Sequence, residues 1–276
     1  MWRLAAVFVA GLVLAGCAGD DDDDDTSTRT LVAAFYPLAW AAERIAGDDI
    51  AVVNLTPPGA EPHDVELSPR DVDTLHDAEH VVYVGGGFQP AVEDAIDGRD
   101  GPSLDVLREE EQDPHVWLDP VRFADVARSL GRELDRPAAA GALADELARL
   151  DASFRSRLAA CERRVLVTTH SAFRHLADRY GLAELALAGS SPEAEPGPRE
   201  LERLVEEVRA SGATTVFAEP LVSDRLAETV AREAGVTVAT LDPLEGLSAE
   251  RLDAGEDYLS VMRDNLAALR TALQCR

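Results

Sequence analysis

Residues 31–59 read LVAAFYPLAWAAERIAGDDIAVVNLTPPG and carry the pattern that decides the fold. Leu31–Phe35 is an apolar run that predicts a buried strand, and Leu38–Ile45 predicts a helix. Ile50–Leu55 predicts a second strand, which Pro57-Pro58-Gly59 ends. Two buried strands separated by a helix indicate a parallel α/β sheet with helices on its faces.

The alternation continues on both sides of a helical middle. Ser68-Pro69 predicts a helix start, and Val81–Val84 predicts a third strand. Between residues 120 and 160 there is no strand signal, and apolar spacing predicts a long helix over 138–160, roughly 35 Å in length. Strands are then predicted at 165–169, 185–188, 215–218 and 236–241, and a terminal helix at 257–273. We therefore expect two α/β lobes, 30–119 and 161–276, joined by a rigid helical connector, 120–160.

The N-terminus predicts export. Residues 1–16 have the charge and the short apolar run of a signal peptide, and the run is too short to span a bilayer as a mature helix. Leu14-Ala15-Gly16-Cys17 resembles a lipobox, so Cys17 is a candidate for lipidation; an ordinary signal peptide with an incidental Cys17 is the alternative. Asp20–Asp25 makes residues 17–29 an acidic, disordered tether between membrane and folded body.

Charge and cysteine content narrow the class of protein. The formal net charge is -26, with 52 acidic and 26 basic residues, which argues against nucleic-acid binding because phosphate contacts need clustered basic side chains.

If Cys17 is lipidated, Cys161 and Cys275 remain as a pair in an oxidising compartment. A disulfide between them is the expectation, and two free buried thiols are the alternative.

Four residues are candidate metal ligands because they follow predicted strands or lie in Pro-containing turns. They are His63, His115, His170 and Asp242. Ligands of parallel α/β sheets bind beyond the carboxyl ends of strands, so the four would converge in the cleft between the lobes. Three imidazoles and one carboxylate suit tetrahedral Zn²⁺, whereas a manganese site would more often carry extra carboxylates.

The remaining candidates are assigned supporting or structural roles. Glu219 ends a strand of the second half and is a candidate partner that orients a ligand imidazole, and Glu61 is a weaker one. The other three histidines, His76, His80 and His175, lie away from the predicted cleft and are taken as structural.

Several segments together resemble the zinc and manganese solute-binding proteins of ABC importers, the family called cluster A-I or cluster 9. The matching segments are 34–38, 61–69, 113–120, 169–173, 191–198, 216–220 and 241–244. The resemblance implies two lobes joined by one long helix, with His63, His115, His170 and Asp242 as the ligands. Zinc-binding members resemble this chain in having His at the position of His170. One departure is the short acidic stretch 108–112, where many zinc members carry a His-rich loop.

The function that follows is capture of zinc by a monomeric lipoprotein, held to the cell membrane through Cys17, for delivery to an ABC permease and its separate ATPase. The sequence carries no phosphate-binding Gly-x-x-x-x-Gly-Lys motif, so no ATPase activity is expected. The alternatives are a manganese or iron binder of the same family, a hinge-type binder of vitamins or siderophores, and a zinc-dependent hydrolase. The hydrolase alternative lacks a His-Glu-x-x-His helix and a Gly-x-Ser-x-Gly elbow.

Overall fold

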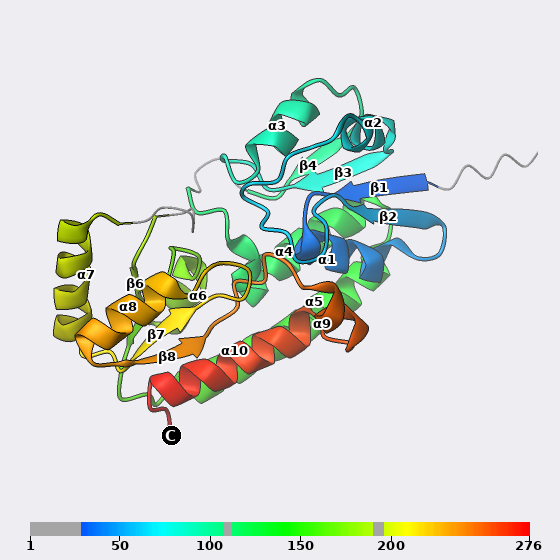
Figure 1. The fold of residues 1–276 in the computed structure, drawn as a ribbon. Helices are drawn as coiled ribbons and strands as arrows, with labels where there is room; N and C mark the ends of the chain where they lie inside the picture. The colour runs from blue at the N-terminus through cyan, green and yellow to red at the C-terminus, as the bar shows by residue number, and fades with distance from the viewer. Residues whose placement is uncertain (1–28, 108–111, 190–195) are drawn as a thin grey trace, which may run out of the picture.

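The computed structural model describes residues 29–107, 112–189 and 196–276. They form two lobes, each built on a four-stranded sheet with helices packed on it (Figure 1). The first sheet has the order β2-β1-β3-β4 and the second β6-β5-β7-β8, and every strand pairing in both is parallel. The strands are β1 (Arg29–Ala33), β2 (Ile50–Asn54), β3 (His80–Tyr83), β4 (Ser103–Asp105), β5 (Val165–Thr168), β6 (Ala183–Ala186), β7 (Thr215–Ala218) and β8 (Thr237–Thr240).

Helices connect consecutive strands and form the middle of the chain. In the first lobe they are α1 (Tyr36–Ala46), α2 (Pro69–Asp77), α3 (Pro90–Asp97) and the 3-10 helix η1 (Val116–Leu118). The middle and the second lobe contain α4 (Pro120–Glu133), α5 (Pro137–Leu158), α6 (Arg174–Tyr180), α7 (Pro198–Ser211), α8 (Arg225–Ala234), α9 (Ala249–Asp253) and α10 (Tyr258–Ala272). None of the helices within these described ranges is long and apolar enough to cross a membrane.

The connector is fixed by local sequence signals and by packing. Asp119 caps α4 by accepting a 2.8 Å hydrogen bond from the backbone N–H of Val121, and Pro120 occupies the first turn. The long helix α5 has 22 residues and buries one apolar side, including Leu147 and Phe154. One apolar core runs from the first lobe through α4, α5 and α10 into the second lobe, and a smaller core lies between α7, α8 and the second sheet.

Residues 161–276 were expected to form the second lobe, but the last part of this range packs against the connector and the first lobe. Helix α10 packs along the connector α5, and its first residue, Tyr258, stacks on Trp40 of α1 at a ring-centroid distance of 4.8 Å. A disulfide joins Cys161 and Cys275, just beyond the ends of α5 and α10. The chain therefore returns to the first lobe after β8 and then follows the connector back.

Most of the predicted elements are present, with shifts at their ends. The long helix expected at 138–160 is α5, and the terminal helix expected at 257–273 is α10. The strand expected at 185–188 is β6, displaced to Ala183–Ala186, and the short elements β4, α3 and α9 had no sequence prediction. The signal peptide, Cys17 and the acidic run of the tether lie outside the described residues.

Candidate metal centre

The predicted histidines meet between the lobes, each placed by the end of a strand. His63 lies in the loop between β2 and α2, and His115 lies between β4 and η1. His170 follows the internal strand β5 after a single residue, Thr169. Because parallel strands end at one edge of a sheet, two lobes facing each other by these edges bring the three imidazoles together.

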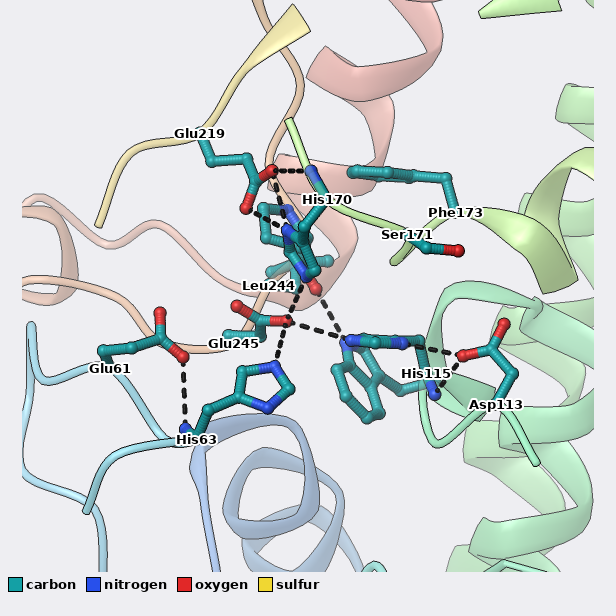
Figure 2. A network of polar contacts seen from close by, with 12 residues as sticks. Glu61, His63, Asp113, His115, His170, Ser171, Phe173, Glu219, Leu244 and Glu245 are labelled. Carbon is teal, nitrogen blue, oxygen red and sulfur yellow. Dashed lines mark hydrogen bonds and ion pairs between the residues drawn. The ribbon is translucent and has the colours of Figure 1, made fainter. Parts of the chain in front are cut away.

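A fourth side chain, Glu245, completes the cluster. One ligand atom from each of His63, His115, His170 and Glu245 lies within 4.8 Å of the others. Figure 2 shows the three rings directed at the Glu245 carboxylate. Glu245 Oε1 is 3.4 Å from the Nε2 of His63 and 3.2 Å from the Nε2 atoms of both His115 and His170.

These separations fit a tetrahedral ion. Ligand atoms at about 2.0–2.1 Å from zinc stand about 3.3–3.4 Å apart along the edge of a regular tetrahedron. The Nε2 of His115 is buried and has no hydrogen bond of good geometry to any described residue. A buried imidazole nitrogen without such a bond is costly unless a ligand occupies the space it faces. The arrangement of donors therefore suits a small divalent cation with nitrogen and oxygen ligands.

The position expected for Asp242 is taken by Glu245, and this is a correction to the sequence analysis. Asp242 is buried, but its Oδ2 lies 2.7 Å from Arg251 Nη1 and its Oδ1 accepts a 2.7 Å hydrogen bond from the backbone N–H of Leu244. The Asp242 carboxylate therefore binds the backbone of its own loop and the Arg251 side chain of α9, and it is not a member of the cluster. The only sequence signal for Glu245 was a second carboxylate in the loop after β8.

Carboxylates also contact two of the imidazoles at Nδ1, the ring nitrogen that does not face Glu245 (Figure 2). Glu219 Oε1 lies 2.8 Å from the Nδ1 of His170 and also accepts from the hydroxyl of Thr169. Asp113, which no sequence pattern pointed out, has its Oδ1 at 2.7 Å from the Nδ1 of His115. Such contacts fix the ring orientation and leave Nε2 as the metal-binding nitrogen.

Glu61 has a different contact from the one expected of an imidazole partner. Its Oε1 accepts a 3.1 Å hydrogen bond from the backbone N–H of His63 and does not reach the ring. The ring of His63 packs edge-on against Phe88, with centroids 4.5 Å apart. Glu61 therefore orders the loop that carries His63, and Phe88 restrains the imidazole itself.

The electrostatics of the metal-free centre favour a cation. Burial alone would lower the pKa of His170, but hydrogen bonds to Glu219 and Glu245 outweigh it and raise that pKa to about 10. Burial likewise opposes charge on His115, yet Asp113 and Glu245 raise its pKa. Burial would raise the pKa of Glu245, but the three histidines hold it well below its usual range. The centre therefore holds protons where a divalent ion would sit.

The other histidines lie outside this cluster. His76 Nε2 is 3.1 Å from the carbonyl of Ala95, and His80 lies beside Glu79 at 3.4 Å. His175 Nε2 is 2.9 Å from the carbonyl of Asp113 and so contacts the segment that carries His115. These contacts agree with the structural roles assigned to the three residues.

These observations place the chain in a class of two-lobed α/β proteins that have a three-histidine, one-carboxylate cluster suited to a metal ion between the lobes. The family described as "Zinc-uptake complex component A periplasmic" matches residues 31–272, and this chain belongs to that family.

Curated relatives agree with this assignment. The zinc-binding lipoprotein AdcA of Streptococcus pneumoniae serotype 4 is 33% identical over 274 residues, covering 87% of this chain and 55% of AdcA. The chain thus corresponds to about half the length of AdcA. The high-affinity zinc uptake system protein ZnuA of Bacillus subtilis is 28% identical over 311 residues, covering 99% of this chain and 97% of ZnuA.

Solved structures share the fold. The Zn(II)-bound ZnuA-like domain of Streptococcus pneumoniae AdcA has a TM-score of 0.76 and 34% identity, covering 89% of this chain and 99% of that one. The laminin-binding protein Lmb of Streptococcus agalactiae has a TM-score of 0.79 and 29% identity, and the match covers 89% of this chain and 99% of that one. These similarities extend over both lobes and the connector.

Proposed function

We propose that this chain is an extracytoplasmic solute-binding protein that captures one zinc ion between its lobes and delivers it to the permease of an ABC importer. The ligands are His63, His115, His170 and Glu245. The observation that carries this proposal is the convergence of three Nε2 atoms on one carboxylate oxygen of Glu245, at 3.2–3.4 Å. Relatives described as zinc-binding and zinc-uptake proteins support the choice of metal.

The donor set favours zinc over manganese and binding over catalysis. Three nitrogens and one oxygen match the tetrahedral preference of Zn²⁺, whereas Mn²⁺ prefers more oxygen ligands in a larger shell. A hydrolase needs an open position for water on the metal. Glu245 fills the fourth position here, which suits a protein that holds its ion as cargo.

Location and partners follow from the proposed role. Lipidation of Cys17 would anchor a monomeric chain to the outer side of the cell membrane, and the AdcA relative described as a lipoprotein supports this anchoring. Transport would depend on a separate permease and a separate ATPase, because the sequence has no phosphate-binding motif of its own.

The proposal is tested by titrating the metal-free protein with zinc against a chromogenic chelator and counting bound metal. The double variant His63→Ala/His170→Ala should lose tight zinc binding while its circular dichroism remains that of the wild type. The matched control is His76→Ala/His80→Ala, which removes two histidines outside the centre and should bind zinc normally. Wild-type zinc affinity in the first variant, or tighter binding of manganese than of zinc by the unaltered protein, would refute the proposed site or the proposed metal.

A further inference from the structure

A cavity of about 500 Å³ opens in the seam between α5 and α10, and none of the four cluster residues lines it. Four arginines line this cavity, which we call the α5–α10 groove: Arg149, Arg157, Arg263 and Arg270. Leu150 and Leu266 are buried beneath them and form an apolar floor. Arg149, Arg157 and Arg263 are exposed, and Arg270 is partly buried.

The arginines form two pairs, one at each of two levels along the helices. Helices α5 and α10 run side by side in the same direction, because the disulfide joins Cys161 and Cys275, each three residues past its helix end (Figure 1). Counting back from the cysteines, Arg149 and Arg263 are both twelve residues away, and Arg157 and Arg270 are four and five residues away. At 1.5 Å per residue the two levels are about 11 Å apart.

The positive charge of the groove is not neutralised within the described part of the chain. The one carboxylate in its lining, Glu146, is already bound by Arg44 at 2.6 Å. No ion pair links any of the four groove arginines to a described carboxylate, and the buried Nε of Arg270 has no hydrogen-bond partner there. Four uncompensated arginines on one seam stand out in a chain whose net charge is -26.

Two arginine pairs at a fixed spacing suit phosphate groups. The planar guanidinium donates paired hydrogen bonds to phosphate oxygens and is more weakly hydrated than an ammonium group. The exposed arginines at the rim can reach a surface laid across the groove, while Arg270 lies lower in it. The ligand chemistry is therefore that of several phosphates presented together.

We propose that the α5–α10 groove docks onto the phosphate headgroups of anionic lipids in the membrane that anchors the chain. This inference rests on the proposed function, because it uses the lipid anchor at Cys17. Cys17 precedes Arg29 by twelve residues, so the folded body begins at most about 40 Å from the bilayer. The tether keeps the groove at a high effective concentration near headgroups, and the acidic remainder of the body is repelled from them.

Docking through both arginine pairs sets the orientation of the protein. With the two levels in contact with headgroups, α5 and α10 lie along the membrane plane. The α5–α10 pair then forms the membrane-facing side of the molecule.

The test uses the chain from residue 17 onward with Cys17→Ser, so that no acyl chain contributes. Flotation with phosphatidylcholine vesicles is compared with flotation on vesicles containing roughly 30% phosphatidylglycerol, at low and physiological salt. The unaltered groove should bind the anionic vesicles in a salt-sensitive way. The variant Arg149→Glu/Arg263→Glu should bind them at least about tenfold more weakly, since each basic residue near an anionic surface is worth roughly fivefold.

The matched control is Arg199→Glu/Arg225→Glu, which makes the same change in net charge on exposed parts of α7 and α8. It should stay within about twofold of the parent protein if the groove is the docking surface. Equal loss in both variants, equal binding to neutral vesicles, or binding of soluble polyphosphate without vesicle binding would overturn the proposal. Zinc titration of the same samples reports separately on the metal centre, so a failure of zinc capture is distinguished from a failure of docking.

Discussion

The indole N–H of Trp117 donates a 2.7 Å hydrogen bond to the backbone carbonyl of Pro243. Trp117 is two residues after His115, and Pro243 is two residues before Glu245. The hydroxyl of Tyr258 donates in turn to the carbonyl of Trp117 at 2.6 Å. The segment that carries His115, before the connector, and the segment that carries Glu245, after β8, are therefore held in register by one buried hydrogen bond and its neighbour.

Removing this hydrogen bond should weaken both folding and zinc binding. Trp117→Phe keeps an aromatic ring but leaves the carbonyl of Pro243 without its donor, which costs about 1–3 kcal/mol of unfolding free energy. Zinc affinity should fall by roughly three- to thirtyfold, because binding must then order the Glu245 loop against His115. Chelator competition measures the affinity, and denaturant unfolding measures the stability.

The control for this variant is Trp40→Phe. Trp40 is also buried and stacks on Tyr258, but it lies on α1, and among the described residues no hydrogen bond joins its side chain to the segments that carry His115 and Glu245. It should lose stability and keep its zinc affinity. An equal fall in zinc affinity in both variants would show that general loosening of the core, and not the Trp117–Pro243 bond, controls the centre.

Glu245 and Asp242 are distinguished by a pair of isosteric substitutions. Glu245→Gln removes the charged oxygen on which the imidazoles converge. It should weaken zinc binding at least about a hundredfold, because loss of residues that only support a metal ligand already weakens metal binding by about ten- to a hundredfold. Asp242→Asn should reduce stability through its lost ion pair with Arg251 and change zinc affinity far less. Isothermal titration with zinc decides between them, and the reverse order of effects would restore Asp242 as the ligand.

The sequence could place the histidines but could not choose between these carboxylates. His63, His115 and His170 follow strands or lie in Pro-containing turns, so topology alone brings them to one edge. Asp242 and Glu245 share one loop, and the choice depends on its conformation. Leu244 has a positive φ of 57°, and Arg251, nine residues after Asp242, binds the Asp242 carboxylate. Neither the left-handed backbone at Leu244 nor the contact between Asp242 and Arg251 can be predicted from the spacing of residues along the sequence.

Some elements of the fold could likewise be predicted from the local sequence, whereas others depend on contacts between residues far apart in the chain. The long helix α5 is evident from its apolar spacing, and the strands of both sheets from their apolar runs. The three-residue strand β4 carries too few residues for a pattern, and it forms only because it pairs with β3. The position of α10 in the fold depends on tertiary contacts such as the stacking of Tyr258 on Trp40 of α1, which no local periodicity encodes.

Zinc binding should release protons and strengthen as pH rises. The pKa of His170 is raised to about 10, so this imidazole carries a proton at neutral pH in the metal-free centre, and the pKa of His115 is also raised above its usual value. Zinc needs neutral imidazoles, and falling pH therefore opposes binding across the whole range below about pH 10. Calorimetry in buffers of different ionisation enthalpy should show proton release on zinc binding at pH 7.5, with His170 supplying one proton. Binding without proton release would contradict the electrostatics described for the centre.

An ion-pair network around the buried carboxylate of Asp151 should make the unfolding free energy depend on pH in the acid range. Asp151 of α5 accepts hydrogen bonds from Arg155 at 2.8 Å and from Arg179 of α6 at 2.7 Å. Burial would raise the pKa of Asp151, but the hydrogen bonds from Arg179 and Arg155 outweigh it and hold that pKa below its usual range. Because the folded pKa lies below the unfolded value, the stabilisation is fully present above about pH 5 and is lost as pH falls through the folded pKa.

Asp151→Asn should therefore cost about 2 kcal/mol at pH 7, and the difference from wild type should shrink toward pH 3. Urea unfolding at several pH values measures it. Glu207→Gln is the matched control, because the Arg203–Glu207 pair is solvent-exposed and should contribute less than about 1 kcal/mol. A pH-independent cost for Asp151→Asn would assign its effect to packing and not to charge.

The disulfide should matter for stability and little for zinc. Cys161 and Cys275 close a loop with a sequence separation of 114, and cross-linking over such a length restricts the unfolded chain by about 4–5 kcal/mol in the chain-entropy model. Cys161→Ser/Cys275→Ser should lower the unfolding free energy by that order and leave zinc affinity within about threefold, because the bridge lies at the ends of α5 and α10 and no cluster residue contacts it. Reduction of the wild type should reproduce the loss. If the variant kept full stability but lost zinc binding, the ends of these helices would have to control the distance between the lobes, and the connector could no longer be treated as a passive support.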